Sequence, residues 1–177
     1  MIEFINRKCS LSKCKLYRWI LEFEILNYKK ELIFIGLNPS LSDNEFTDNT
    51  TKKIIKISTY NGYEKLNIIN LFALITKDPN VLKTHNDPVG FYNNQVIKSS
   101  LKYWSGNINC DLWLGWGNKG KLFFRDENVL KIISKYRKLK QKKFLESFSP
   151  LIIRKTKYDK PIHPLYCLDN SKFIKYA

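Results

Sequence analysis

The sequence predicts an α/β protein: a three-layer sandwich with a central, mostly parallel sheet of four to five strands and helices on both faces. Short apolar segments alternate along the chain with segments of helical spacing. Glu31–Gly36 (ELIFIG) contains a continuous apolar run, which is typical of a strand buried on both faces. No repeat, low-complexity linker or Pro/Gly-rich boundary divides the chain, so residues 1–177 are expected to form a single domain.

Five segments are expected to be strands because they are rich in branched and aromatic residues or are continuously apolar. In chain order they are Leu16–Leu26, Glu31–Gly36, Lys65–Leu74, Cys110–Gly117 and Lys142–Phe148.

Three segments between or after these strands have apolar residues at helical spacing. They are Thr50–Thr59, Gly90–Trp104 and Glu127–Lys140. Thr50 and Thr51 are expected to cap the first of these helices. The last is basic and amphipathic, with one apolar side formed by Val129, Ile132, Ile133 and Tyr136.

Composition excludes several classes of protein. Apolar residues make up 44% of the chain and aromatic residues 14%, which suits a globular protein rather than a disordered one. No window approaches the ~18 apolar residues of a membrane span. The N-terminal segment has no secretion-signal pattern, so a cytoplasmic protein is expected. The spacing of the four cysteines fits no zinc motif, and neither a metal nor another cofactor is expected.

The formal net charge of +15 is unevenly distributed. Residues 131–160 hold eleven Lys or Arg and two acidic residues, so +9 of the total lies there. Such a concentration favours binding to a polyanion such as DNA, because neutralised phosphates release counterions. The alternative is that a chain rich in Lys, Asn and Ile uses lysine as its main solvating residue. Charge alone leaves both explanations open.

Four polar positions follow or end the apolar strands, where open α/β sheets bind ligands. They are Asn38, Asn70, the loop Trp116–Gly120 (WGNKG), and His163 in a Pro-rich segment near the C-terminus. Each has an ordinary structural explanation when it is taken alone, as a turn residue, a strand-end hydrogen bonder or a packed loop residue. Their order along the chain makes a shared site the stronger hypothesis.

That order resembles the uracil-DNA glycosylase superfamily. Residues 33–43 (IFIGLNPSLSD) are similar to the first motif of its mismatch-specific uracil/thymine branch, which reads Gly-Ile-Asn-Pro-Gly. Residues 67–72 (NIINLF) resemble the segment whose Asn reads a pyrimidine. Residues 111–121 (DLWLGWGNKGK) look like the Leu-Leu-Trp-Gly strand and loop, and residues 162–166 (IHPLY) stand where the closing His-Pro-Ser motif belongs.

A narrower resemblance extends over nearly the whole chain, from Cys14 to Cys167. The runs CKLYRW, LNPS, NLFALITKDP, DPVG, WG and HPLY resemble the bacterial and phage family called domain of unknown function 1643.

The superfamily resemblance implies a uracil-DNA glycosylase-like fold and a monofunctional DNA glycosylase. Such an enzyme flips out a deaminated or 5-substituted pyrimidine and hydrolyses its N-glycosidic bond, in base-excision repair or in phage–host defence. Asn38 would orient the attacking water, with Asp43 or Asp48 supplying a carboxylate. His163 would donate a hydrogen bond to the base carbonyl on which negative charge develops.

The resemblance also implies how the base and the DNA are held. Asn70 would read the base edge, and Phe46 would stack on the ring, unless Phe46 is simply a core residue. Ser40 replaces a bulky Tyr of uracil-specific members and so leaves room for a 5-substituent. Leu165 would fill the vacated stack, since the closing motif lacks its phosphate-binding serine. The expected phosphate contacts are Asn118, Lys119, Lys135, Arg137, Lys138 and Lys140.

Two other functions remain open at this stage. The fold could bind free nucleotides without acting on DNA, which Asn at the water position and the missing serine favour. It could also be a non-catalytic nucleic-acid-binding module, which the net charge favours. Nothing in the sequence requires more than a monomer.

Overall fold

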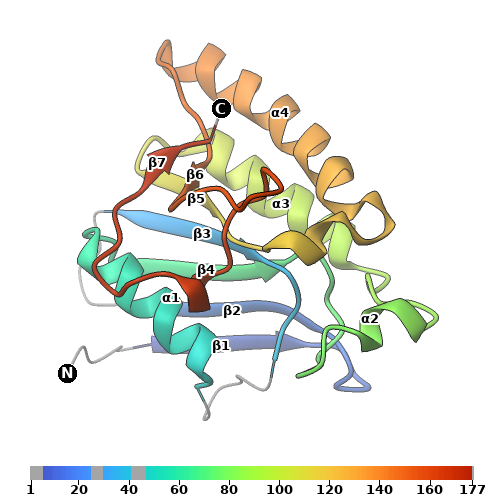
Figure 1. Ribbon diagram of the computed structural model, residues 1–177. Helices are drawn as coiled ribbons and strands as arrows, with labels where there is room; N and C mark the ends of the chain where they lie inside the picture. Colours follow the sequence, from blue (N-terminus) through green and yellow to red (C-terminus); the bar gives the residue numbers. More distant parts are fainter. Residues whose placement is uncertain (1–5, 25–29, 41–46, 177) are drawn as a thin grey trace.

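The computed structural model describes residues 6–24, 30–40 and 47–176 of the chain, and its centre is a seven-stranded sheet (Figure 1). The strand order is β1-β2-β4-β3-β5-β6-β7. The strands are β1 (Asn6–Leu11), β2 (Arg18–Glu24), β3 (Glu31–Gly36), β4 (Lys65–Asn70), β5 (Cys110–Leu114), β6 (Leu151–Ile152) and β7 (Ile174–Lys175). The helices are α1 (Asn49–Tyr60), α2 (Val81–Thr84), α3 (Asn93–Gly106) and α4 (Arg125–Phe144), with 3-10 turns η1 (Asn118–Phe124) and η2 (Pro164–Tyr166).

The sheet is mixed, so the expectation of a mostly parallel sheet of four to five strands is not confirmed. The central strands β4, β3, β5 and β6 run parallel to one another. At the two edges, β1 pairs with β2, β2 with β4, and β6 with β7 in antiparallel fashion. The edge strands carry a weak sequence signal, because β1 is polar and largely exposed and β6 and β7 have two residues each.

Helices cover both faces of the sheet, as expected. Ile33 and Ile35 of β3 pack on one face with residues of α3 and α4. Leu32 and Phe34 alternate to the other face, where they pack with α1 and with the segment leading to the C-terminus. The continuous apolar run of β3 is therefore explained, because all six of its residues are buried.

Two local expectations are wrong. The strand expected at Lys142–Phe148 is instead the last turn of α4 and the loop after it, since the helical pattern continues to Phe144 and ends at Leu145 in the left-handed region (φ 56°). The cap of α1 is Asp48, whose carboxylate accepts a hydrogen bond from the Thr51 N–H, and not Thr50 or Thr51.

Candidate active site

A cavity of about 160 Å³ lies beyond the carboxyl ends of β3 and β4. Side chains from β2, from the segment after β3, from α1 and from η2 complete its walls. Its lining includes Arg18, Phe34, Asn38, Ser40, Asp48, Asn70, His163 and Leu165. Six of these were named from the sequence, and the fold brings them together although they are separated by up to 127 positions of the chain: Asn38, Ser40, Asp48, Asn70, His163 and Leu165.

Asn38 is held in one orientation by the backbone. Its Nδ2 donates to the Pro39 carbonyl oxygen at 2.9 Å and to the Thr76 carbonyl oxygen at 2.8 Å. These two bonds use both amide protons, so Oδ1 is the group of this amide that remains for a ligand to bind. Oδ1 accepts hydrogen bonds and is a weak base, so it can orient a water molecule without deprotonating it.

Asn70, the last residue of β4, is only 4% exposed. Within the described residues its Nδ2 has no hydrogen-bond partner. Leaving a buried donor unsatisfied costs about 1–3 kcal/mol, so this amide is best explained by an acceptor that a ligand supplies. Gly36 pairs with Asn70 across the strands, and a Cβ at Gly36 would lie 2.8 Å from Asn70 Oδ1. The glycine thus leaves room for the amide over β3.

His163 caps η2, and its Nδ1 accepts a hydrogen bond from the Leu165 N–H at 3.4 Å. Burial lowers the pKa of His163, and the nearby Asp48 carboxylate offsets this only in part. The ring is therefore neutral at pH 7 and carries its proton on Nε2, because Nδ1 acts as an acceptor. It lines the cavity as a neutral N–H donor.

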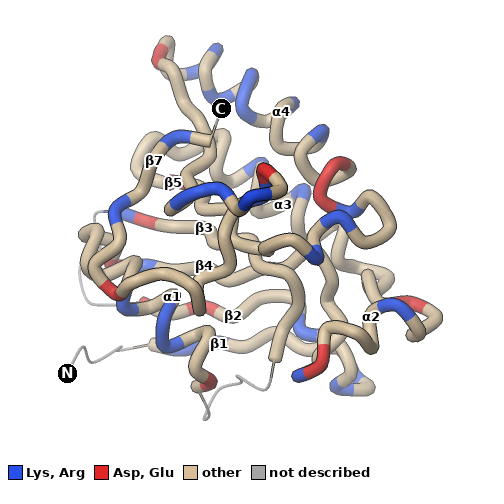
Figure 2. The backbone as a smooth tube through the Cα atoms, in the orientation of Figure 1, with Lys and Arg blue, Asp and Glu red and all other residues tan. Residues whose placement is uncertain are grey.

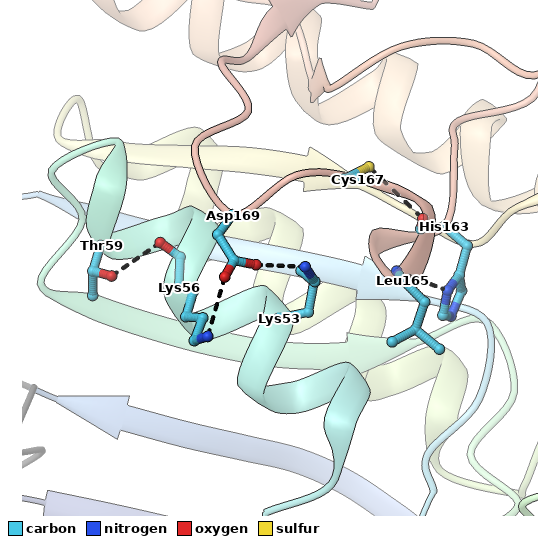
Figure 3. A network of polar contacts seen from close by, with 7 residues as sticks. All are labelled: Lys53, Lys56, Thr59, His163, Leu165, Cys167 and Asp169. Carbon is cyan, nitrogen blue, oxygen red and sulfur yellow. Dashed lines mark hydrogen bonds and ion pairs between the residues drawn. The ribbon is translucent and has the colours of Figure 1, made fainter. Parts of the chain in front are cut away.

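Two contacts fix the segment that carries His163. Asp169 forms ion pairs with Lys53 at 2.5 Å and Lys56 at 3.1 Å, which ties the chain after η2 to α1 (Figure 3). On its other side, Gly117 donates its N–H to the Pro161 carbonyl oxygen at 2.9 Å. A Cβ at Gly117 would lie 3.3 Å from His163 Cβ. The glycine of the WGNKG loop therefore serves to position His163.

Gly117→Ala should lower both stability and activity, whereas Gly62→Ala should lower stability alone. Both glycines have positive φ, 69° and 80°, where an L residue costs about 1–2 kcal/mol. Nothing lies within 4 Å of a Cβ at Gly62, while a Cβ at Gly117 meets His163. Thermal unfolding and activity assays on the two variants measure the difference. Equal activity of the two variants would argue against a positioning role for Gly117.

Asp48 is the one carboxylate among the described residues that line the cavity. Its Oδ1 accepts the Thr51 N–H at 2.7 Å, and its Oδ2 accepts from Ser40 Oγ. The other two residues of the predicted site, Asp43 and Phe46, lie outside the described residues.

Among the residues of the cavity wall that sequence reasoning missed are Phe34 and Arg18. Phe34 alternates with its neighbours like any core strand residue, yet its ring lies over Gly115 and contacts Trp113 edge-on at 4.6 Å between ring centroids. Phe34 is thus the described aromatic side chain of the wall. Arg18 is 3% exposed and lies in the CKLYRW run, whose composition indicated only a strand.

The residues expected to contact DNA divide into two groups. Asn118 and Lys119 are exposed on the loop beside the cavity, where Asn118 Oδ1 accepts from Thr156 Oγ1 at 2.6 Å and Lys119 Nζ donates to Asn80 Oδ1 at 3.2 Å. The second group lies on α4, where Lys135 and Lys138 are exposed. Arg137 is half-buried, and its Nε donates to the Phe148 carbonyl oxygen at 2.7 Å.

Lys140 corrects the expectation of a DNA contact on α4, because it is fully buried. Its Nζ donates to the carbonyl oxygens of Trp104, Asn107 and Cys110 at 3.0, 2.7 and 2.6 Å. Cys110 is the first residue of β5, so the C-terminal part of α4 lies near the amino ends of the parallel strands. The cavity lies at their carboxyl ends. The basic residues that recur along α4 (Figure 2) therefore do not surround the cavity.

Lys140→Met should destabilise the protein by about 3 kcal/mol or more, because three buried carbonyls would lose a donor at about 1–3 kcal/mol each. Lys138→Met, on the exposed side of α4, should change stability by no more than about 0.5 kcal/mol. Urea unfolding of both variants tests this. Equal midpoints would show that the buried ammonium contributes nothing.

The depressed pKa of His163 predicts a pH-dependent stability. The unfolded chain binds a proton near pH 6.5, and the folded chain does so only at lower pH, because burial lowers the pKa. Stability from this group is complete above about pH 6.5 and is lost as the pH falls through the folded pKa. The wild-type melting temperature should therefore fall more steeply between pH 7.5 and 5 than that of His163→Gln. Parallel curves would contradict this.

Comparison with known proteins identifies the family to which the chain belongs. A family model described as "Protein of unknown function (DUF1643)" matches residues 18–165, and the chain belongs to this family. No curated protein and no solved structure gave a significant match. These comparisons do not link the chain to the uracil-DNA glycosylase superfamily. Across the part of the chain that the structure describes, no helix is both long and apolar enough to cross a membrane.

Proposed function

We propose that the protein is a DNA glycosylase that extrudes a deaminated or 5-substituted pyrimidine into the cavity and hydrolyses its N-glycosidic bond. The observation that carries this proposal is the convergence on one small cavity of a fixed amide oxygen, an unpartnered amide donor and a neutral imidazole, from Asn38, Asn70 and His163. The cavity, at about 160 Å³, is smaller than the ~300–1,000 Å³ of pockets for drug-sized ligands, which suits a single base.

The three groups fit the steps of the proposed reaction. Asn70 has a donor and an acceptor on one amide, which is the complement of the carbonyl and N–H on a pyrimidine edge. As the glycosidic bond breaks, negative charge develops on the base, and a donor held in place stabilises it. The Nε2–H of His163 supplies that donor, while Asn38 Oδ1 orients the water that attacks the sugar.

A second hollow of about 300 Å³ adjoins the cavity and supports a 5-substituted substrate. The two share Ser40, Asp48, Thr50 and Lys77. Ser40 is small, so a group attached to the base ring has room to pass beside it. The hollow is lined largely by polar side chains, which favours a hydroxylated substituent over an apolar one.

One observation favours a second candidate, a binder of free nucleotides without hydrolysis. Both oxygens of Asp48 already accept hydrogen bonds, from Thr51 and Ser40, so this carboxylate is not poised as a general base. The exposed lysines of α4 also lie away from the cavity. A protein that binds a nucleotide without hydrolysing it needs neither a general base nor an extended DNA-binding surface.

Base release from DNA separates the candidates. The protein is incubated with oligonucleotides containing uracil, thymine mismatches, 5-hydroxymethylcytosine or glucosylated 5-hydroxymethylcytosine, and abasic sites are then cleaved with alkali. Strand breaks that disappear in Asn38→Ala establish the glycosylase and identify its base. Absence of breaks on every substrate, together with saturable binding of a free nucleotide, would establish the second candidate instead. The proposed unit on DNA is the monomer, which sedimentation of the complex tests.

A further inference from the structure

Two adjacent aromatic residues at the junction of η1 and α4 have an unusual backbone conformation. Phe123 and Phe124 both lie in the left-handed region, with φ 54° and 53°. A bulky residue is disfavoured there, and two in succession are more costly still. Both side chains nevertheless face solvent, with 54% and 70% of their surface exposed. The burial of these two side chains therefore does not offset the free-energy cost of the left-handed backbone.

The junction is anchored from beneath. The ring of Phe123 contacts the buried ring of Phe72 edge-on, with centroids 6.4 Å apart. Arg125, the first residue of α4, is buried, and its Nε donates to the Leu71 carbonyl oxygen at 2.7 Å. These contacts hold the two phenylalanines outward from the edge of the sheet that carries the cavity, since Leu71 directly follows β4.

Exposed lysines of η1, and a tyrosine and a lysine of the hairpin bonded to η1, lie near this pair. Lys121 Nζ lies 6.0 Å from the ring centroid of Tyr158, and Lys157 Nζ lies 5.1 Å from the same centroid. Tyr158 is 60% exposed, and the Asn118–Thr156 hydrogen bond ties its hairpin to η1. We call the following residues the aromatic platform: Lys119, Lys121, Phe123, Phe124, Lys157 and Tyr158.

The acidic residues near the platform are mostly neutralised. Asp126 is buried and forms an ion pair with Lys160 at 2.7 Å. Asp159 forms an ion pair with Lys155 at 2.8 Å. Glu127, in the first turn of α4, is exposed. Three lysines against one acid outside these ion pairs, Glu127, leave the platform positive, which is complementary to a phosphate backbone.

The platform lies within reach of the cavity. Gly117 contacts His163, and Phe123 follows six residues later. Six residues span at most about 20 Å even when fully extended. A DNA strand advances about 3.4 Å per nucleotide, so the platform lies at most about six nucleotides from a base in the cavity.

We propose that the aromatic platform binds single-stranded DNA next to the extruded base. Successive bases stack on the exposed rings of Phe123 and Phe124, and the lysines contact the phosphates between them. This role deepens the proposed function, on which it rests for the choice of DNA, but it requires no hydrolysis. Stacking on an exposed ring tolerates any base sequence, so specificity remains with the cavity.

Binding of a fluorescent ten-nucleotide oligothymidylate, which contains no lesion, tests the platform separately from catalysis. Phe124→Gly should weaken binding about 5- to 150-fold, the range expected for one stacked base. Glycine and asparagine suit the left-handed region, so Phe124→Gly and Phe124→Asn should melt at or above the wild-type temperature. Leu145→Gly is the matched control, because Leu145 is left-handed (φ 56°), 90% exposed and at the other end of α4.

Charge variants give a second, independent measurement. The double variant Lys119→Gln/Lys121→Gln should reduce the slope of log affinity against log salt by about 1.4, and Lys135→Gln/Lys138→Gln on α4 should leave it unchanged. Unaltered affinity in Phe124→Gly and Phe124→Asn, or tighter binding to duplex than to single strand, would overturn the platform. If the oligonucleotide binds through Phe124 but no abasic site ever forms, the platform stands and the glycosylase does not.

Discussion

His163→Ala should lower the rate of the proposed base release by about 100- to 1,000-fold, the range found when one donor to a developing negative charge is removed. Burial keeps the imidazole neutral, and its Nδ1 is occupied by the Leu165 N–H. Nε2–H is therefore the donor that the alanine variant loses. Single-turnover kinetics on the preferred substrate measure this effect without interference from product release.

The chain contains a matched control for this variant. In His85 the Nδ1 likewise accepts a hydrogen bond from the N–H two residues later, that of Asp87 at 3.1 Å, but His85 is not among the residues that line the cavity. His85→Ala should leave base release within about twofold of wild type. An equal loss of rate in both histidine variants would mean that the His163 effect arises from local folding and not from the cavity.

Asn70→Leu should stabilise the empty protein while abolishing base binding. The variant removes a buried amide whose Nδ2 has no partner in the described part of the chain, in exchange for an apolar side chain of similar shape. Relief of an unsatisfied buried donor should raise the free energy of unfolding by about 1–3 kcal/mol. A gain in stability coupled to loss of binding is typical of a functional residue.

Asn93→Leu should have the opposite effect on stability. Asn93 is fully buried, and its Nδ2 donates to the carbonyl oxygens of Asn70 and Leu71 at 3.1 and 2.9 Å. Loss of these two bonds should cost about 1–3 kcal/mol. Urea unfolding measures the stability of the two variants, and titration of each variant with the free base measures base binding. If Asn70→Leu is as destabilised as Asn93→Leu, the Asn70 amide is a structural group and not a ligand donor.

The positions of the cavity residues could be predicted because they depend on strand direction. Asn38 and Asn70 follow or end two apolar strands, and parallel strands present their carboxyl ends at the same edge. The alternation of Ile33, Phe34 and Ile35 fixes which side chains pack on each face of β3. These arguments need only the period of the strand and the order of the motifs.

Other features depended on tertiary contacts that a single sequence does not reveal. Lys138 and Lys140 are both lysines on the same helix, yet Lys140 is buried among carbonyl oxygens and Lys138 is exposed. The two-residue strands β6 and β7 depend on tertiary pairing, since β6 pairs with the edge of β5 and β7 pairs with β6. Phe34 has the sequence signal of a core residue, because a strand residue that lines a cavity and one that packs in the core both alternate with residues on the opposite face of the sheet.

The capping of α1 by Asp48 links the proposed ligand to the first turn of a helix. The oxygen that accepts the Thr51 N–H belongs to a carboxylate that lines the cavity. A ligand that draws this carboxylate toward itself would weaken the cap, and one that leaves it in place would strengthen the turn by excluding water. Hydrogen–deuterium exchange at the Thr51 amide would then report occupancy of the cavity directly, without any label on the ligand.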